Sequence, residues 1–262
     1  MDEGDHDGAV MHLREAVRGD PRAHYSLGLE LFKAGKLDDA IKELEVFVRA
    51  RPLLLEVVPA RTLMGRAFLT QEKWPDAVKQ FQMVLMMTPL NVEAEGLLAE
   101  ALFKQQAFGE AIVHYQAYLK YRPNDANMLG NLGIALAASG KNDEAISAFR
   151  RAVELTPQDG GAERNLANAL LDNRDFSDAA LHAQRAVTLR PDDPVVHDLL
   201  GLALAPQGKL DEAEAEFRRA LEIDPTDGEV RGHLAAVLQR RASLARAPRA
   251  DGPSPRAGSG PP

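Results

Sequence analysis

Residues 128–157 read MLGNLGIALAASGKNDEAISAFRRAVELTP, and this stretch contains the pattern that decides the fold. Apolar residues recur every three or four positions in two blocks, 129–136 and 145–152, as on one face of a helix. Gly140 lies between the blocks, where a helix can end in a left-handed residue, and Pro157 closes the stretch. The stretch therefore predicts two antiparallel helices joined by a tight turn.

The same unit recurs along the chain. Six similar segments end in a proline, and the last four intervals between these prolines are 34 residues each. An alanine stands twelve residues before every one of these prolines, and a glycine or alanine stands twenty-four residues before it. A period of this length is typical of solenoids, whose stacked units share a continuous core. The prolines are Pro52, Pro89, Pro123, Pro157, Pro191 and Pro225.

These residues resemble the tetratricopeptide repeat, in which a Leu-Gly pair is followed by an A-x₃-F element and a closing proline. Here the pair reads Leu132-Gly133 and the element runs from Ala145 to Phe149. The resemblance covers residues 21–242 and implies an all-α, right-handed superhelical solenoid of antiparallel helix pairs. The glycine of the turn is replaced in three repeats, by Glu72, Gln106 and Arg174. We expect weaker turns at these three positions.

The repeat pattern also predicts how the chain is divided. We expect a partial leading repeat with only its second helix over 1–20, a capping helix over 228–242 and a disordered tail over 243–262. The six complete repeats cover 21–54, 58–91, 92–125, 126–159, 160–193 and 194–227. The tail is rich in Arg, Pro, Gly, Ser and Ala and lacks the apolar residues of a core.

Two segments depart from the regular pattern. The helix over 9–17 has lost its partner helix, so its apolar residues Val10, Leu13 and Val17 should be frayed or covered by another molecule. A second copy of the chain, stacked end to end, is one such cover. The segment 51–59 is apolar where a loop should be polar. It either packs on the junction of repeats one and two or forms an exposed patch for a partner.

Composition excludes several classes of function. The formal net charge is −8, which argues against a nucleic-acid partner. The chain has no cysteine, which excludes disulfides, thiolate metal sites and thiol nucleophiles. It has neither a run of about 20 apolar residues nor a basic, then apolar, N-terminal signal. We therefore expect no membrane insertion and a cytoplasmic location, which stays open if the chain is an N-terminally truncated fragment.

Candidate chemical sites are better explained by packing or solvation. The acidic residues 2–8 hint at a calcium loop, but Arg14 stands where its bidentate glutamate must be. The histidines lack the spacing of a zinc site, and His24 and His197 occupy a core-edge position. No nucleophile triad or glycine-rich phosphate loop is visible. The sequence thus predicts no catalytic, cofactor-binding or metal-binding residues, no cofactor and no enzyme.

The remaining candidate site is the face of the first helices that points away from the core. In tetratricopeptide repeat proteins this face lines a concave groove, and the resemblance carries this over. The predicted groove residues are Tyr25, Lys33, Arg66, Lys104, Asn131, Arg164, Asn165 and Asn168. Asn131 and Asn165 stand 34 residues apart and resemble the asparagine ladder in the solenoid of O-GlcNAc transferase, whose amides hold a peptide backbone. The alternative is a solvated asparagine near a helix start.

These patterns favour a non-catalytic scaffold that binds a protein or peptide segment in the concave groove, with repeats four and five as the expected position. Arg164 would bind a carboxylate of the ligand there. The Lys-and-Asn clamp of chaperone adaptors is not matched. An alternative is the interaction region of a larger enzyme, such as a glycosyltransferase, or of a membrane-system protein. Self-association through the N-terminal end is a further possibility, and the sequence does not identify the partner.

Overall fold

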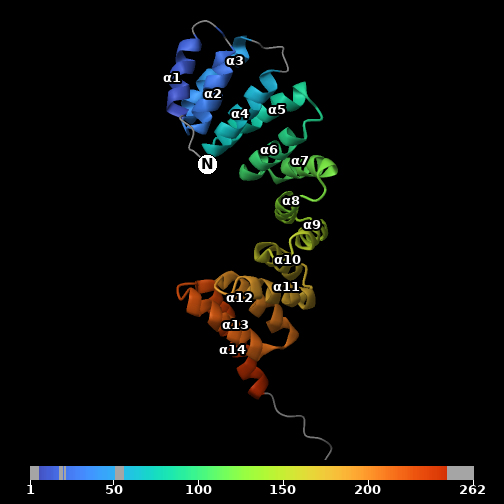
Figure 1. Cartoon of the computed structure of the whole chain (residues 1–262). Helices are drawn as coiled ribbons and strands as arrows, with labels where there is room; N and C mark the ends of the chain where they lie inside the picture. The colour runs from blue at the N-terminus through green and yellow to red at the C-terminus, as the bar shows by residue number, and fades with distance from the viewer. Residues whose placement is uncertain (1–5, 18–19, 21, 51–55, 247–262) are drawn as a thin grey trace, which may run out of the picture. The chain divides into compact units, whose positions relative to one another are not determined.

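The fold is entirely helical. A computed structural model describes residues 6–17, 20, 22–50 and 56–246. These residues form fourteen α-helices and one short 3-10 helix, with no strand among them. Consecutive helices pack against each other in pairs (Figure 1). The prediction of an all-α solenoid of helix pairs is therefore confirmed.

The chain divides into two compact units, residues 1–157 and 158–262. The first unit contains the single helix α1 (His6–Ala16) and four helix pairs, each joined by a turn of three residues. The pairs are α2 (Ala23–Lys33) with α3 (Leu37–Ala50), α4 (Val57–Thr70) with α5 (Trp74–Met87), α6 (Val92–Lys104) with α7 (Phe108–Tyr121), and α8 (Ala126–Ala138) with α9 (Asn142–Leu155).

The second unit contains two helix pairs and one final helix. The first pair is α10 (Gly160–Asp172) with α11 (Phe176–Leu189). The second is α12 (Pro194–Leu204) with α13 (Leu210–Ile223), connected through the 3-10 helix η1 (Ala205–Gln207). The final helix, α14 (Gly228–Arg246), covers this pair, and its Val230 and Val237 are buried in the same apolar cluster as Phe217.

In three repeats the small residue of the first helix is a glycine because an aromatic ring of the second helix lies directly over it. A Cβ atom on Gly65 would lie 2.4 Å from a ring carbon of Phe81, closer than real Cβ contacts. The corresponding distance is 2.5 Å both from Gly133 to Phe149 and from Gly201 to Phe217. The Leu-Gly and A-x₃-F elements are thus two sides of one helix–helix contact.

The turns within the pairs keep one geometry whether or not they contain glycine. Gly35 and Gly140 have left-handed φ angles of 72° and 75°. Glu72, Gln106 and Arg174 adopt φ angles of 57°, 61° and 61° at the same position of their turns. All five turns also close with the same backbone hydrogen bond of 2.9 Å. The loss of glycine therefore does not change the conformation of these turns. A non-glycine residue in the left-handed region costs about 1–2 kcal/mol, and the packing of the helix pair offsets this cost.

The N-termini of most first helices are capped by an Asp or Asn side chain that accepts a backbone N–H. Asn91, Asp125, Asp159 and Asp193 cap α6, α8, α10 and α12 in this way. The carboxylate of Asp20 accepts from the N–H of Arg22 at 2.8 Å, directly before α2. Neither α2 nor α4 is capped by the side chain of its own N-cap residue, which is Arg22 in α2 and Glu56 in α4.

The helix α1 requires a correction to the sequence prediction. Its apolar face is covered within the chain: Val10 is 4% exposed in a cluster with Leu27 and Leu31 of α2, and Leu13 and Val17 pack against it. The second helix of an incomplete repeat still packs on the first helix of the next repeat. Val10 is therefore buried within the chain, and Leu13 and Val17 are partly buried there.

In the segment 51–59, residues 51–55 lie outside the described residues, whereas Val57 is 1% exposed. Val57 belongs to an apolar cluster with Phe47 of α3 and Ala60 of α4. This part of the segment packs on the junction of repeats one and two, as the first of the two interpretations expects.

The end of the chain also differs from the prediction. The helix α14 continues to Arg246, past the predicted end at 242, so residues 243–246 are helical and not disordered. Ala242, Leu244 and Ala245 are strong helix formers and explain this extension. The rest of the predicted tail, 247–262, lies outside the described residues. Within the described part of the chain, no helix has the length and apolar character to cross a membrane.

Candidate peptide-binding groove

The first helices of the first unit form a layer of their own. Helix α2 contacts α4, α4 contacts α6, and α6 contacts α8, in addition to the contacts within each pair. On this layer the side chains of α2 and α4 enclose two adjacent cavities, which we call the α2/α4 groove. The cavities share Tyr25 and Pro59 as lining residues. They therefore lie side by side, with Phe47 of α3 lining the first and Asn91 and Glu93 at the start of α6 lining the second.

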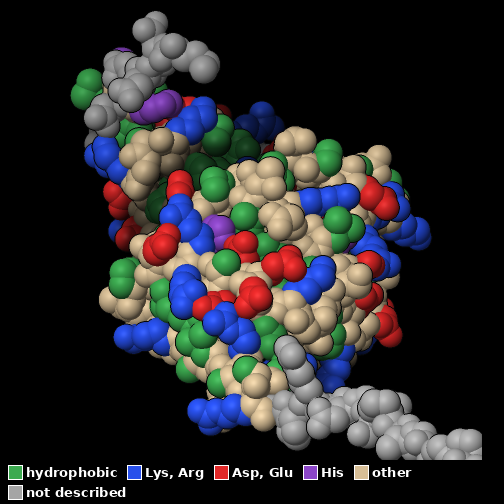
Figure 2. All heavy atoms as spheres, turned by 90° about the horizontal axis from the view of Figure 1, so that it is seen from below, with side chains coloured by type: hydrophobic (Ala, Val, Ile, Leu, Met, Phe, Trp, Pro, Cys, Tyr) green, Lys and Arg blue, Asp and Glu red, His purple; other side chains and the backbone are tan. Residues whose placement is uncertain are grey.

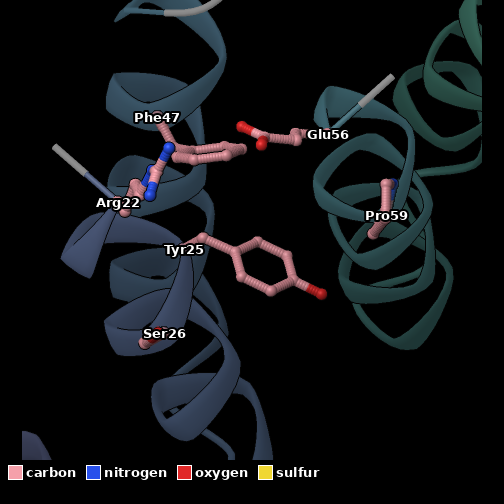
Figure 3. A pocket seen from close by; sticks show the side chains of 6 residues that line it. All are labelled: Arg22, Tyr25, Ser26, Phe47, Glu56 and Pro59. Carbon is pink, nitrogen blue, oxygen red and sulfur yellow. The ribbon is translucent and has the colours of Figure 1, made fainter. Parts of the chain in front are cut away.

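The two cavities of the α2/α4 groove have volumes of about 390 Å³ and 370 Å³. The first is lined by Arg22, Tyr25, Ser26, Phe47, Glu56 and Pro59 (Figure 3). The second is lined by Tyr25, Leu29, Val58, Pro59, Thr62, Leu63, Arg66, Asn91 and Glu93. Volumes of this size are typical of pockets that bind ligands.

Tyr25 is the central side chain of the groove. Its ring packs on that of Phe47, with ring centroids 5.5 Å apart, and projects from α2 toward α4 (Figure 3). Pro59 lies opposite, in the first turn of α4, where the missing N–H of proline leaves no helical hydrogen bond unmade. The groove thus combines a positioned aromatic ring with aliphatic walls.

The charges around the groove are mostly paired. Arg66 binds Glu93 at 2.5 Å, so this predicted groove residue carries a neutralised charge. Glu56 takes part in an interaction of its own. Arg22 is different, because its guanidinium has no hydrogen bond or ion pair with any described residue. In Figure 3, Arg22 and Glu56 flank the ring of Phe47 from α2 and α4.

Other predicted groove residues of the first unit lie outside these cavities. Lys33 binds Glu30 at 2.7 Å, and Lys104 is exposed at the end of α6. Asn131 of α8 is half-buried beside the hydroxyl of Tyr115. Burial raises the pKa of this hydroxyl, and the charge of Glu100 acts in the same direction. Asn131 therefore lies beside a neutral phenol.

The remaining predicted groove residues belong to the second unit. Arg164 is held by Asp193 at 3.5 Å, and Asn165 is half-buried while Asn168 is exposed. Asn131 and Asn165 thus lie in different units, and neither unit contains both rungs of the predicted ladder. In the second unit, burial raises the pKa of the Asp198 carboxyl, and a 2.8 Å hydrogen bond from His233 opposes part of that rise.

A regular set of histidine–carboxylate pairs joins the helices within the repeats, and sequence reasoning missed it. In four repeats a His and a Glu that are 19 residues apart hydrogen-bond across the helix pair, through Nδ1 and Oε2. The pairs are His24 with Glu43 (2.6 Å), His114 with Glu95 (2.6 Å), His182 with Glu163 (2.6 Å) and His197 with Glu216 (2.7 Å). The histidine lies on the first helix in two pairs and on the second helix in the other two.

In the repeat formed by α4 and α5, Arg61 donates to Gln80 at the same spacing, at 2.9 Å. The histidines are thus structural, and the expectation that His24 and His197 lie at the core edge fits their burial. The signal in the sequence was the constant spacing of 19 residues between a histidine and a glutamate. It becomes visible only when both residue types are considered together, because either one can come first. Among the described residues, no group of three His, Asp or Glu side chains is arranged to hold a metal.

The face of the molecule drawn in Figure 2 carries closely mixed charge. Figure 2 shows basic and acidic side chains interspersed over the visible face, with apolar ones scattered between them. Ion pairs also connect α13 and α14, where Arg218 and Arg241 both bind the buried Glu214.

Comparison with protein-family models agrees with the repeat geometry. The model described as tetratricopeptide repeat matches residues 1–53, 62–120, 108–160 and 164–228. The chain belongs to the tetratricopeptide repeat family. Proteins of this family are typically non-enzymatic scaffolds for protein–protein interaction, and the chain has the architecture of such a scaffold. No curated protein matches it in sequence.

Solved structures of tetratricopeptide repeat proteins share the fold. The C-terminal part of a repeat protein from Cytophaga hutchinsonii superposes with a TM-score of 0.71 at 16% identity, covering 88% of this chain and 95% of its own. YrrB, described as having an unusual peptide-binding site, gives 0.64 at 14% identity, covering 76% and 97%. MamA from Desulfovibrio magneticus gives 0.61 at 21% identity, covering 65% and 95%. At these identities the likeness concerns the fold alone.

Proposed function

We propose that this tetratricopeptide repeat protein is a non-catalytic scaffold that binds a peptide segment of a partner protein in the α2/α4 groove. The observation that carries the proposal is the pair of adjoining cavities centred on Tyr25. Buried aromatic side chains at the centre of an interface contribute most of its binding energy. Tyr25 is partly exposed, held by Phe47, and faces the cavities, so it can act as such an anchor.

The proposed site contains two of the predicted groove residues, but it lies in repeats one and two and not in repeats four and five. Tyr25 and Arg66 line the cavities, whereas the predicted site in repeats four and five depended on Asn131, Arg164 and Asn165. Two features favour the α2/α4 groove over that position. Arg164 is already bound to Asp193, and the two asparagines lie in different units.

A peptide selection with the full chain tests this function. Random twelve-residue peptides are displayed on phage, and the dissociation constant of the tightest one is measured by fluorescence anisotropy. Tyr25→Ala should weaken binding at least ~10-fold, because it removes the ring shared by both cavities. Tyr121→Ala is the matched control, since Tyr121 is 52% exposed on α7 and lies outside the groove.

Thermal unfolding of both variants checks that each remains folded. Loss of binding in Tyr25→Ala, with Tyr121→Ala within about twofold of the parent, supports the proposal. Equal affinities of parent and Tyr25→Ala would reject the α2/α4 groove as the binding site. Failure to select any peptide would reject peptide binding itself.

A further inference from the structure

We infer that the peptide bound in the α2/α4 groove presents a bulky apolar side chain beside a carboxylate, and that Arg22 binds this carboxylate. The inference rests on the proposed function, because it specifies the ligand of the same groove. Three features of the groove carry it: its apolar lining, the pairing of the surrounding charges, and the sides on which the opposite charges lie.

The apolar part of the ligand follows from the lining of the first cavity. The rings of Tyr25 and Phe47 meet at 45° and form one wall, and Pro59 lies across from Tyr25 (Figure 3). Phe47 is only 4% exposed, so its ring forms the buried base of this wall and not the rim. An aromatic or branched side chain that enters here contacts two rings and a proline, and removes this apolar surface from water.

The carboxylate follows from the balance of charge. Of the charged side chains that line the two cavities, Arg66 and Glu93 bind each other, and Glu56 already has an interaction. Among the described residues, Arg22 bonds only through its backbone, to Asp20 and Tyr25, so its guanidinium has no partner there. An arginine pairs with a carboxylate through two parallel hydrogen bonds, so a carboxylate is its complementary ligand group.

The positions of the charges also set the side on which the carboxylate binds. Arg22 lies at the start of α2 and Glu56 directly before α4, so opposite charges flank the cavity mouth (Figure 3). Arg22 therefore attracts a carboxylate on the α2 side of the cavity. The chain has a net charge of −8, so the attraction is local, and added salt should weaken it.

Five fluorescent peptides test the inference with the full chain. Four are acetylated, amidated decapeptides of Gly and Ser with a central triplet: Asp-Phe-Asp, Lys-Phe-Lys, Ser-Phe-Ser or Asp-Ala-Asp. The fifth ends in Ser-Phe with a free carboxylate. The parent should bind Asp-Phe-Asp at least ~5-fold more tightly than Lys-Phe-Lys, and Asp-Ala-Asp should bind at least ~10-fold more weakly than Asp-Phe-Asp. Preferential binding of the fifth peptide would assign the carboxylate to a chain end.

Arg22→Glu should abolish or invert the preference for the acidic peptide. Arg14→Glu changes the net charge by the same amount on α1, outside the groove, and should keep the preference. An unchanged preference in Arg22→Glu would overturn the inference and leave the groove as a binding site. If no designed peptide binds while library-selected peptides still require Tyr25, the inference fails and the proposed function stands. If the selected peptides do not require Tyr25 either, the proposed function fails as well.

Discussion

Ala145→Asp is expected to lower the free energy of unfolding by at least ~3 kcal/mol, because it buries an unpaired charge. Ala145 is fully buried on α9, where this helix packs against α8. The close approach of these helices is visible at Gly133, where a Cβ atom would lie 2.5 Å from the ring of Phe149. No room for a carboxylate exists at such a contact.

Chemical denaturation followed by circular dichroism measures this loss. Ser147→Asp introduces the same group at an exposed position of α9 and should change stability by no more than about 0.5 kcal/mol. Amide exchange should accelerate first in α8 and α9, since each repeat of a solenoid is stabilised mainly by its neighbours. A variant that unfolds like the parent would mean that Ala145 is not at a packed contact.

His182→Glu is expected to cost about 2–3 kcal/mol, because it places two carboxylates against each other across α10 and α11. Its partner Glu163 is 2% exposed and also has the guanidinium of Arg185 at 3.6 Å. Adding Glu163→His should recover most of the lost stability. The double variant again pairs a histidine with a glutamate, but with the histidine on the first helix and the glutamate on the second. The repeat of α12 and α13 already has that arrangement, in His197 and Glu216.

A double-mutant cycle in denaturant measures the coupling between the two positions. The account requires the double variant to be more stable than His182→Glu by at least about 1 kcal/mol. A double variant as unstable as the sum of the two single changes would show that the two side chains do not act as a pair.

The sequence allows the repeat architecture to be predicted because its determinants are local and recur. The small residue at Gly65, Gly133 and Gly201 and the aromatic residue that covers it lie 16 residues apart in each repeat. One unit therefore predicts the others. The turns at Glu72, Gln106 and Arg174 show the limit of residue preference, since the packed helix pair imposes a left-handed residue where glycine is absent.

The groove could be predicted from the sequence only in part. Tyr25 and Arg66 were predicted from their place on the helix. The cavities, however, depend on how α4 packs against α2, and the irregular segment 51–59 lies between the repeats that contain these helices. Sequence position also cannot reveal whether an arginine is already paired: Arg66 and Arg164 are, whereas the guanidinium of Arg22 has no partner among the described residues. These facts come from distances between helices, which no single repeat contains.

The central claim, that a peptide binds between α2 and α4, is tested most directly by amide hydrogen exchange of the full chain with and without the tightest selected peptide. The account predicts slower exchange in α2 and α4, centred on the turns that carry Tyr25 and Pro59, with Tyr25→Ala removing this protection. Protection confined to other helices, with exchange in α2 and α4 unchanged by the bound peptide, would contradict it.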